Sequence, residues 1–247
     1  MDGLTAGLKN ELQLMLYRKK TIFFFAASVF IPILLILLFH TLQPVMGLIP
    51  VSSSYPVQML EMYTIFLIPL FLFLEIADLF PQEISSRTLK LALLRPITRL
   101  GAYLAKFLAL GIAIGALLLL LGTVSALCNL WFGSWGSVDT FGLLKAYAAA
   151  FLSMWSLAAL FVCIAQFFRS AGGFVVFAIL IYAGAKVAPY FQQGFSSFSI
   201  TSYTGWYSLW LGHSISAGRL ATGSLFLLSG LILFLAIGYF FFERKEV

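Results

Sequence analysis

Six stretches of the sequence are apolar over about 20 residues or more, which is the length that an α-helix needs to cross a bilayer. They cover residues 21–42, 58–80, 102–128, 145–168, 172–191 and 222–242. The chain is 62% hydrophobic and 10% charged, whereas about a quarter of the residues in a soluble domain are charged. We therefore expect an all-α integral membrane protein with six transmembrane helices, and not a soluble globule.

The lysines and arginines predict the orientation of these helices. Cytoplasmic loops carry an excess of Lys and Arg, so the richer side is the inner one. Twelve of the fifteen basic residues fall on one side, in the segments 9–20, 87–106, 169 and 244–245. Both termini are therefore expected to be cytoplasmic. The net charge of +6 follows from this bias; it suits anionic lipid headgroups and does not indicate nucleic acid.

The first 20 residues form a separate region before the transmembrane domain of residues 21–247. Apolar side chains recur there at helical spacing, at Leu4, Leu8, Leu12, Met15 and Leu16. This pattern is typical of an amphipathic helix that lies on the inner membrane surface. A plain flanking segment with a stop of positive charge is the alternative. On the outer side of the membrane, residues 192–221 are aromatic, serine-rich and barely charged. This composition favours a segment that dips into the outer membrane interface.

Motifs of enzymes are missing from the sequence. It has no phosphate-binding loop, no dinucleotide fingerprint, no H-E-x-x-H and no paired-cysteine motif. The stretch "GHSIS" resembles a nucleophile elbow, but Ser216 replaces the second glycine. An intramembrane serine protease would have to use Ser214 with His40, and a chance match explains that pair better. We expect no catalytic residue, no metal site and no cofactor bound by this chain.

Ionisable residues also occur within or at the ends of the apolar runs: Glu61, Glu75, Asp78, Lys106 and Lys186. Charge at membrane depth is costly, so such groups line a path or gate, form structural ion pairs, or extend to the headgroups. Lys106 can pair with Glu75 or Asp78, and Lys186 can pair with Glu61. Gly111 and Gly115 form a small-xxx-small pattern, which marks either close helix packing or a dimer contact.

Residues 78–100, "DLFPQEISSRTLKLALLRPITRL", interrupt the apolar sequence between the second and third runs. Pro81 is expected to end the second span, since proline cannot continue a helix interior without loss. Residues 82–96 can then form a short charged helix along the inner surface, which Pro96 ends. A charged surface helix between two spans is exposed to a cytoplasmic partner.

This segment resembles the signature of the type-2 ABC exporter permeases. The matching positions are Asp78, Glu83, Thr88, Leu89, Leu93, Leu94, Arg95, Pro96 and Arg99. The family usually has glycine immediately before the glutamate and before the threonine, where this chain has Gln82 and Arg87. The six spans, the amphipathic start and the outer segment before the last span follow the same layout.

The resemblance implies a transport subunit without ATPase chemistry of its own. Two such permeases, identical or related, would pair in the plasma membrane of a bacterial cell, and cytoplasmic ATP-binding cassette subunits would supply ATP and magnesium. The residues implied in coupling to them are Glu83, Arg87, Thr88, Arg95, Pro96 and Arg99. A hydrophobic or amphipathic substrate is expected: a drug, an antimicrobial peptide or a lipid-like molecule. The alternatives are an ion-coupled transporter that uses Glu61 or Lys186, and a membrane sensor or immunity protein.

Overall fold

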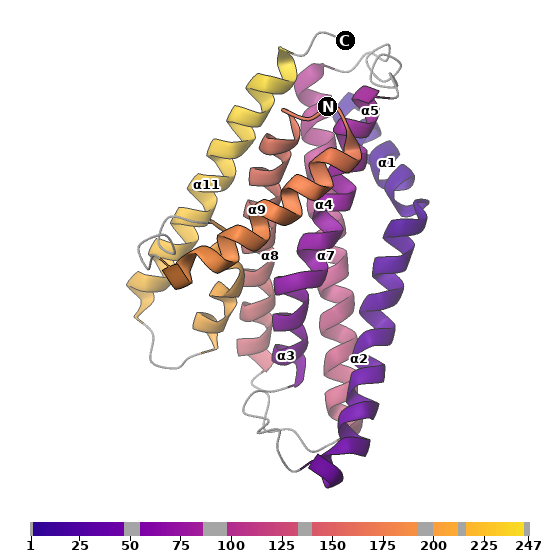
Figure 1. Ribbon diagram of the computed structural model, residues 1–247, viewed down its shortest axis with the longest axis vertical. Helices are drawn as coiled ribbons and strands as arrows, with labels where there is room; N and C mark the ends of the chain where they lie inside the picture. Colours follow the sequence, from indigo (N-terminus) through magenta and orange to yellow (C-terminus); the bar gives the residue numbers. More distant parts are fainter. Residues whose placement is uncertain are drawn as a thin grey trace.

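A computed structural model describes residues 2–46, 55–85, 98–132, 140–191, 200–211 and 216–244. Every regular element in those ranges is helical, and six helices are long and apolar enough to cross a membrane. These findings confirm the all-α fold with six spans. Most of the helices run roughly along the long axis, whereas α9 crosses them obliquely, and both termini lie at the same end (Figure 1). The spans comprise α2 (Lys19–Met46), the second span described below, α7 (Arg99–Phe132), α8 (Thr140–Ala165), α9 (Ala171–Phe191) and α11 (Ala217–Glu243).

Most helices extend beyond the apolar runs from which they were predicted. For example, α8 begins at Thr140 and α7 at Arg99, whereas the runs begin at residues 145 and 102. Backbone hydrogen bonding continues through polar residues at a helix end, so the change in hydropathy does not mark the helix boundary.

The second span contains three consecutive elements: α3 (Tyr55–Met62), a π-helical turn η1 (Tyr63–Leu67) and α4 (Ile68–Leu79). Pro69 accounts for the wide turn, because it has no N–H to donate to the carbonyl of Ile65 and its ring crowds that carbonyl. The hydroxyl of Tyr182, on α9, donates to the Ile65 oxygen instead, at 2.9 Å. The turn therefore fastens the second span to the fifth.

Pro81 marks the end of the second span, as the sequence indicated. The helix α4 ends at Leu79, Phe80 leaves the helical conformation with φ −120° and ψ −70°, and a short helix α5 (Pro81–Ser85) begins at the proline. The remainder of the surface helix predicted over 82–96 lies outside the described residues. Proline is well placed at a first helical position, where its missing N–H is not needed.

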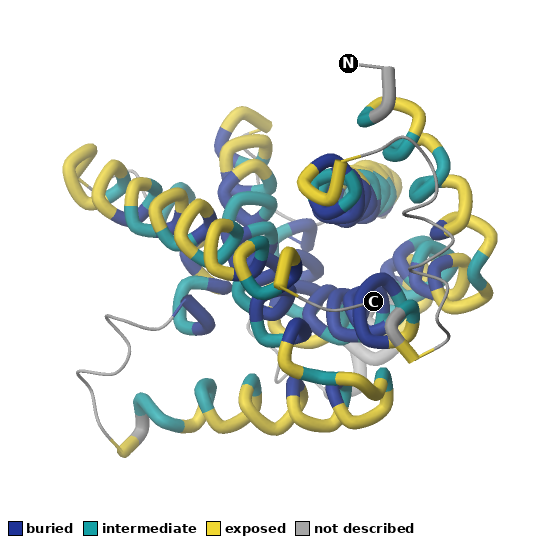
Figure 2. Tube along the Cα trace, turned by 90° about the horizontal axis from the view of Figure 1, so that it is seen from above, coloured by how far each residue is buried: buried dark blue, intermediate teal, exposed yellow. Residues whose placement is uncertain are grey.

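The second and fourth spans are the most buried of the six. In their most apolar windows 72% and 67% of the residues are buried, against 17% in α9 and 22% in α11. Seen from above, buried residues gather inside the bundle while the outer helices carry long exposed faces (Figure 2). Those faces are apolar, with Leu180 and Ile232 both 65% exposed, so lipid or another apolar surface is their natural environment.

Glycines bring large aromatic side chains close to helix backbones inside the chain. A Cβ on Gly111 would lie 2.8 Å from Nε1 of Trp155 on α8. The small-xxx-small pattern therefore marks close packing of α7 on α8 within one chain. Gly223 of α11 makes similar room for Trp206.

The described part of the outer segment is a 3-10 helix, η2 (Ile200–Trp210). Ile200, Thr201, Thr204, Trp206 and Tyr207 are buried, and the helix packs against α8, α9 and α11. The last residues of the predicted segment 192–221 belong to α11, which begins at Ala217, and residues 192–199 and 212–215 lie outside the described residues.

The N-terminal helix α1 (Asp2–Leu16) packs mainly against α7. Met15 is buried, whereas Leu14 and Leu16 are half exposed, at 52% and 56%. A turn at Tyr17 and Arg18 then leads directly into α2. The position of α1 on the membrane surface stays a prediction.

Candidate functional site

The ends of α1, α2, α4, α5 and α7 meet near the end of the bundle where the termini lie (Figure 1). All five ion pairs found among the described residues join these elements or the turn after α1. We call this set the inner charge cluster: Glu11, Arg18, Lys20, Glu75, Asp78, Glu83 and Lys106. The described residues include no group of His, Cys, Asp or Glu that could hold a metal ion.

The first half of the inner charge cluster joins the start of α2 to the end of α4. Glu75, whose side chain is 1% exposed, accepts a hydrogen bond from Thr21 Oγ1 at 2.6 Å and pairs with Arg18 at 3.2 Å. Asp78, one turn further along α4, pairs with Lys20 at 3.1 Å and lies 3.8 Å from Arg18. These contacts satisfy both carboxylates without any contribution from α7.

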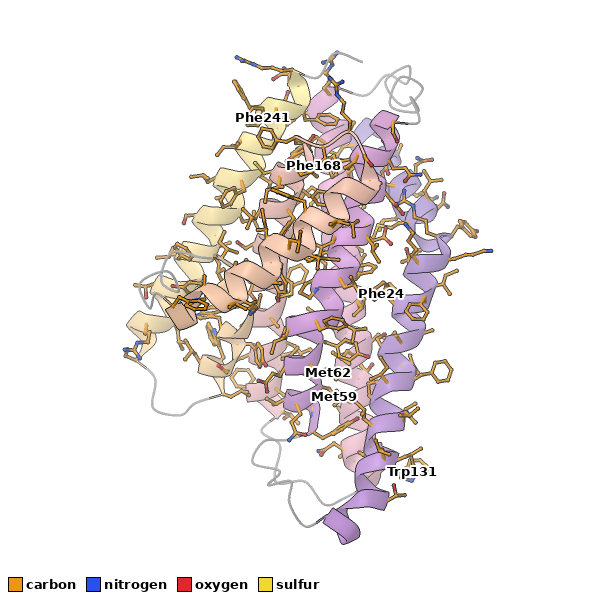
Figure 3. All side chains as sticks on the ribbon, viewed as in Figure 1. Phe24, Met59, Met62, Trp131, Phe168 and Phe241 are labelled. Atoms are coloured by element: carbon orange, nitrogen blue, oxygen red, sulfur yellow. The ribbon has the colours of Figure 1, made fainter. Side chains whose placement is uncertain are left out.

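An aromatic contact lies next to the Thr21–Glu75 pair, one turn further into the bundle. Phe24 lies one turn beyond Thr21 on α2, and Phe71 lies one turn before Glu75 on α4. Their ring centres are 5.4 Å apart in an edge-to-face arrangement, and Phe24 points from α2 toward the second span (Figure 3). The polar and aromatic pairs therefore join the same two helices on adjacent turns, which excludes water from the Thr21–Glu75 hydrogen bond.

Lys106 forms the second half of the inner charge cluster. Its side chain is only 3% exposed, and its Nζ lies 3.1 Å from Oε1 of Glu11 and 2.5 Å from Oε1 of Glu83. One ammonium on α7 thus bridges a carboxylate on the N-terminal helix and a carboxylate on α5. Burying this lysine is tolerable because both neighbours are anionic.

Arg99 contacts a different helix. Its guanidinium donates to the backbone carbonyl of Glu243 at 2.7 Å, within the last turn of α11. A cation there satisfies a carbonyl that has no partner within the helix and complements the helix dipole. Arg99 therefore ties the start of the third span to the end of the sixth.

Two pairings considered from the sequence are wrong. Lys106 contacts neither Glu75 nor Asp78, because the basic residues that precede the first span reach those carboxylates instead. Lys186 does not pair with Glu61: its Nζ donates to Thr204 Oγ1 on η2, and Glu61 lies exposed on α3. Arg87, Thr88, Arg95 and Pro96 lie outside the described residues, so their implied roles stay predictions.

Sequence reasoning missed Glu11 and Thr21. Glu11 belongs to the first 20 residues, which were predicted to form an amphipathic helix, and the charged residues of such a helix normally face water. The buried lysine one turn into the third span was a signal that a nearby acid had to be buried with it. Thr21 gave no signal, since a threonine at the start of an apolar run is common.

A family model described as "ABC-2 family transporter protein" matches residues 8–185. The matched region begins within α1, contains every residue of the inner charge cluster and extends through most of α9. No curated protein matches the chain. The model covers well over half of the sequence, so this multi-pass membrane protein belongs to the ABC-2 transporter family, as the permease component that associates with ATP-binding cassette subunits.

Proposed function

We propose that this chain is the permease of an ATP-driven exporter for a hydrophobic or amphipathic molecule in a bacterial plasma membrane. Two permease subunits would form the pathway, and the inner charge cluster would pass movement from the ATP-binding subunits to the spans. The bridge that Lys106 makes between Glu11 and Glu83 is the observation that carries this proposal.

The position of Glu83 supports the coupling role. It lies in α5, within the segment 78–100 that resembles the family signature. A push on that segment would reach Glu83, then Lys106 on the third span, and through Lys106 the carboxylate of Glu11. Because an ion pair with a buried cation resists separation, these three helices would move together.

The first half of the cluster extends the same unit. Arg18 follows α1 directly and holds Glu75 and Asp78 of the second span. The N-terminal helix is thus joined to the second span by one set of charges and to the third by another. This arrangement suits a rigid inner end that tilts as a body when a cytoplasmic subunit presses on it.

Co-purification tests the proposal most directly. The chain is extracted from its native membrane in mild detergent, and the proteins that accompany it are identified by mass spectrometry. We expect a stoichiometric soluble ATPase with a phosphate-binding loop. Recovery of the chain without any ATPase would overturn the proposal.

The variant Glu83→Gln then tests the coupling role. It keeps the size of the side chain but weakens the bond to Lys106, so we expect lower substrate-stimulated ATPase activity with normal membrane insertion. Glu243→Gln is the matched control, because Glu243 is an exposed carboxylate at the same end of the bundle. Unchanged stimulation in Glu83→Gln would remove Glu83 from the coupling path.

A further inference from the structure

Lys186 differs from the other cations within the spans because it has no anionic partner among the described residues. It lies on α9, the span with the smallest buried fraction. Its ammonium donates one hydrogen bond, to Thr204 Oγ1. It also lies 5.7 Å from the ring centre of Tyr182, one turn earlier on the same helix. Placing a cation without a counter-charge inside a span costs free energy, so such a residue is a candidate functional residue.

The ammonium of Lys186 is directed toward η2. Thr204 is buried on η2, and its hydroxyl donates to the carbonyl of Thr201 at 3.2 Å, so a lone pair of the hydroxyl oxygen accepts from Lys186. Tyr182 is itself fixed, since its hydroxyl donates to Ile65 at the π-helical turn. Lys186 is thus held in place by η2 and by Tyr182, on the face of α9 that packs on the second span.

Two N–H donors of the ammonium have no acceptor among the described residues. A lysine ammonium carries three donors and no acceptor, and one of them is used within the described residues. An anion with several oxygens satisfies the remaining donors and neutralises the charge, which a neutral ligand cannot do.

The exposed side of α9, roughly a third of a turn around the helix from Lys186, is apolar. Val187, the adjacent residue, is 50% exposed, and Leu180 is 65% exposed. A molecule whose anionic group reached Lys186 would therefore lay its apolar part along the lipid-facing side of α9. This combination selects for an amphiphile over a free inorganic anion, because burial of an acyl chain adds favourable free energy for each methylene group.

We propose that Lys186, Thr204 and Tyr182 form a binding site for the anionic headgroup, a phosphate or a carboxylate, of an amphiphilic molecule. The inference rests on the proposed function, since the amphiphile would be the transported substrate. It narrows the substrate class to molecules with a negative headgroup and an apolar tail.

Binding to the purified full-length chain in detergent tests this site without any ATPase. The probes are dihexanoylphosphatidylglycerol and dihexanoylglycerol, which have the same tails but differ in the anionic headgroup, and the readout is calorimetric titration. We expect the charged probe to bind at least about tenfold more tightly, as one charge-assisted hydrogen bond would provide. Equal affinity for the two probes would overturn the proposal.

Variants test whether the preference for the charged probe depends on Lys186. Lys186→Met is expected to abolish it, and Lys186→Arg to preserve it, because the guanidinium keeps both charge and donors. Lys145→Met is the matched control: Lys145 is an exposed lysine on α8 whose ammonium lies 4.1 Å from the ring centre of Phe141. A preference that survives in Lys186→Met, or that disappears equally in Lys145→Met, contradicts the site.

Two further probes separate the sources of the anion. Inorganic phosphate alone should neither bind measurably nor displace phosphatidylglycerol; Lys186-dependent binding of phosphate alone would show that the site takes a free anion and not an amphiphile. Decanoate compared with decanol tests the carboxylate in the same way, and preference for either anionic amphiphile supports the site. The result is independent of co-purification, so a missing ATPase would refute the exporter function and leave this site standing.

Discussion

The inner charge cluster and the surroundings of Lys186 both place cations within membrane-spanning helices, but they neutralise them differently. Lys106 is 3% exposed and lies between two carboxylates, whereas Lys186 has a threonine hydroxyl and an aromatic face. The charge of a cation with anions on either side is compensated, and such a cation holds helices together. The charge of a cation with only neutral neighbours is uncompensated, and its counter-anion has to come from outside the described chain.

Replacing Lys106 should have the largest effect on stability. In Lys106→Met, two largely buried carboxylates would face each other without a counter-charge, and breaking a buried ion pair in this way costs about 3–5 kcal/mol. We expect a clear loss of folded protein in detergent, measured by thermal unfolding and by yield after size-exclusion chromatography. Lys9→Met, which removes an exposed lysine of α1, is the control.

A triple variant that lacks all three charges sharpens this test. Replacing Glu11 and Glu83 by glutamine in the Lys106→Met background removes the facing charges and should recover much of the lost stability. If the triple variant is no more stable than Lys106→Met, repulsion between the two carboxylates is not the reason for the loss, and Lys106 matters through its packing.

Thr21→Val should have an intermediate effect. Valine has nearly the same shape, but the Oε1 of Glu75 would lose its 2.6 Å hydrogen bond. A bond to a charged, buried acceptor contributes about 1.5–3 kcal/mol, so the unfolding temperature should fall by less than in Lys106→Met. Ser28→Ala is the control, because Ser28 is buried on the same helix and its hydroxyl donates to the backbone carbonyl of Phe25 within that helix. Equal losses in the two variants would indicate a general sensitivity of α2.

Arg99→Gln should lower the stability of the protein only slightly. Arg99 is exposed, and a single exposed contact to a helix end contributes about 0.3–1 kcal/mol. Its effect should be local: faster hydrogen exchange in the last turn of α11, near Glu243, with exchange in α8 unchanged. If exchange in that turn is unaffected, the link between the third and sixth spans is not formed in solution.

Hydropathy predicted the six spans because the length of an apolar run depends on neighbouring residues alone. The pairing of charges could not be predicted in the same way. Glu75 and Asp78 lie one turn apart on α4, yet their partners lie 54 to 60 residues earlier in the sequence. Which cation reaches them depends on how α1, α2 and α7 pack around α4, and the intramembrane lysine nearest in sequence proved to have other partners.

The surroundings of Lys186 show the same limit. Lys186 was recognised as unusual from sequence alone, because a lysine in an apolar run is rare. Thr204 and the π-helical turn at residues 63–67 were not recognised. The turn follows from Pro69, a signal that was available. The position of η2 against α9 was not available, because it depends on tertiary packing.

The smallest effect on stability is expected for Lys186→Met, and this contrast with Lys106→Met is the sharpest test of the comparison. The variant loses one hydrogen bond to Thr204 but also removes the cost of an unpaired cation in a span, so the change should stay within about 1 kcal/mol of zero. Thermal unfolding in neutral detergent should therefore be nearly the same as for the unmodified chain. Added phosphatidylglycerol should then raise the unfolding temperature of the unmodified chain and of Lys186→Arg, since a ligand stabilises the state that binds it, but not that of Lys186→Met. A loss in neutral detergent as large as that of Lys106→Met would show that Lys186 already has its counter-charge within the chain, and the distinction between the two lysines would fail.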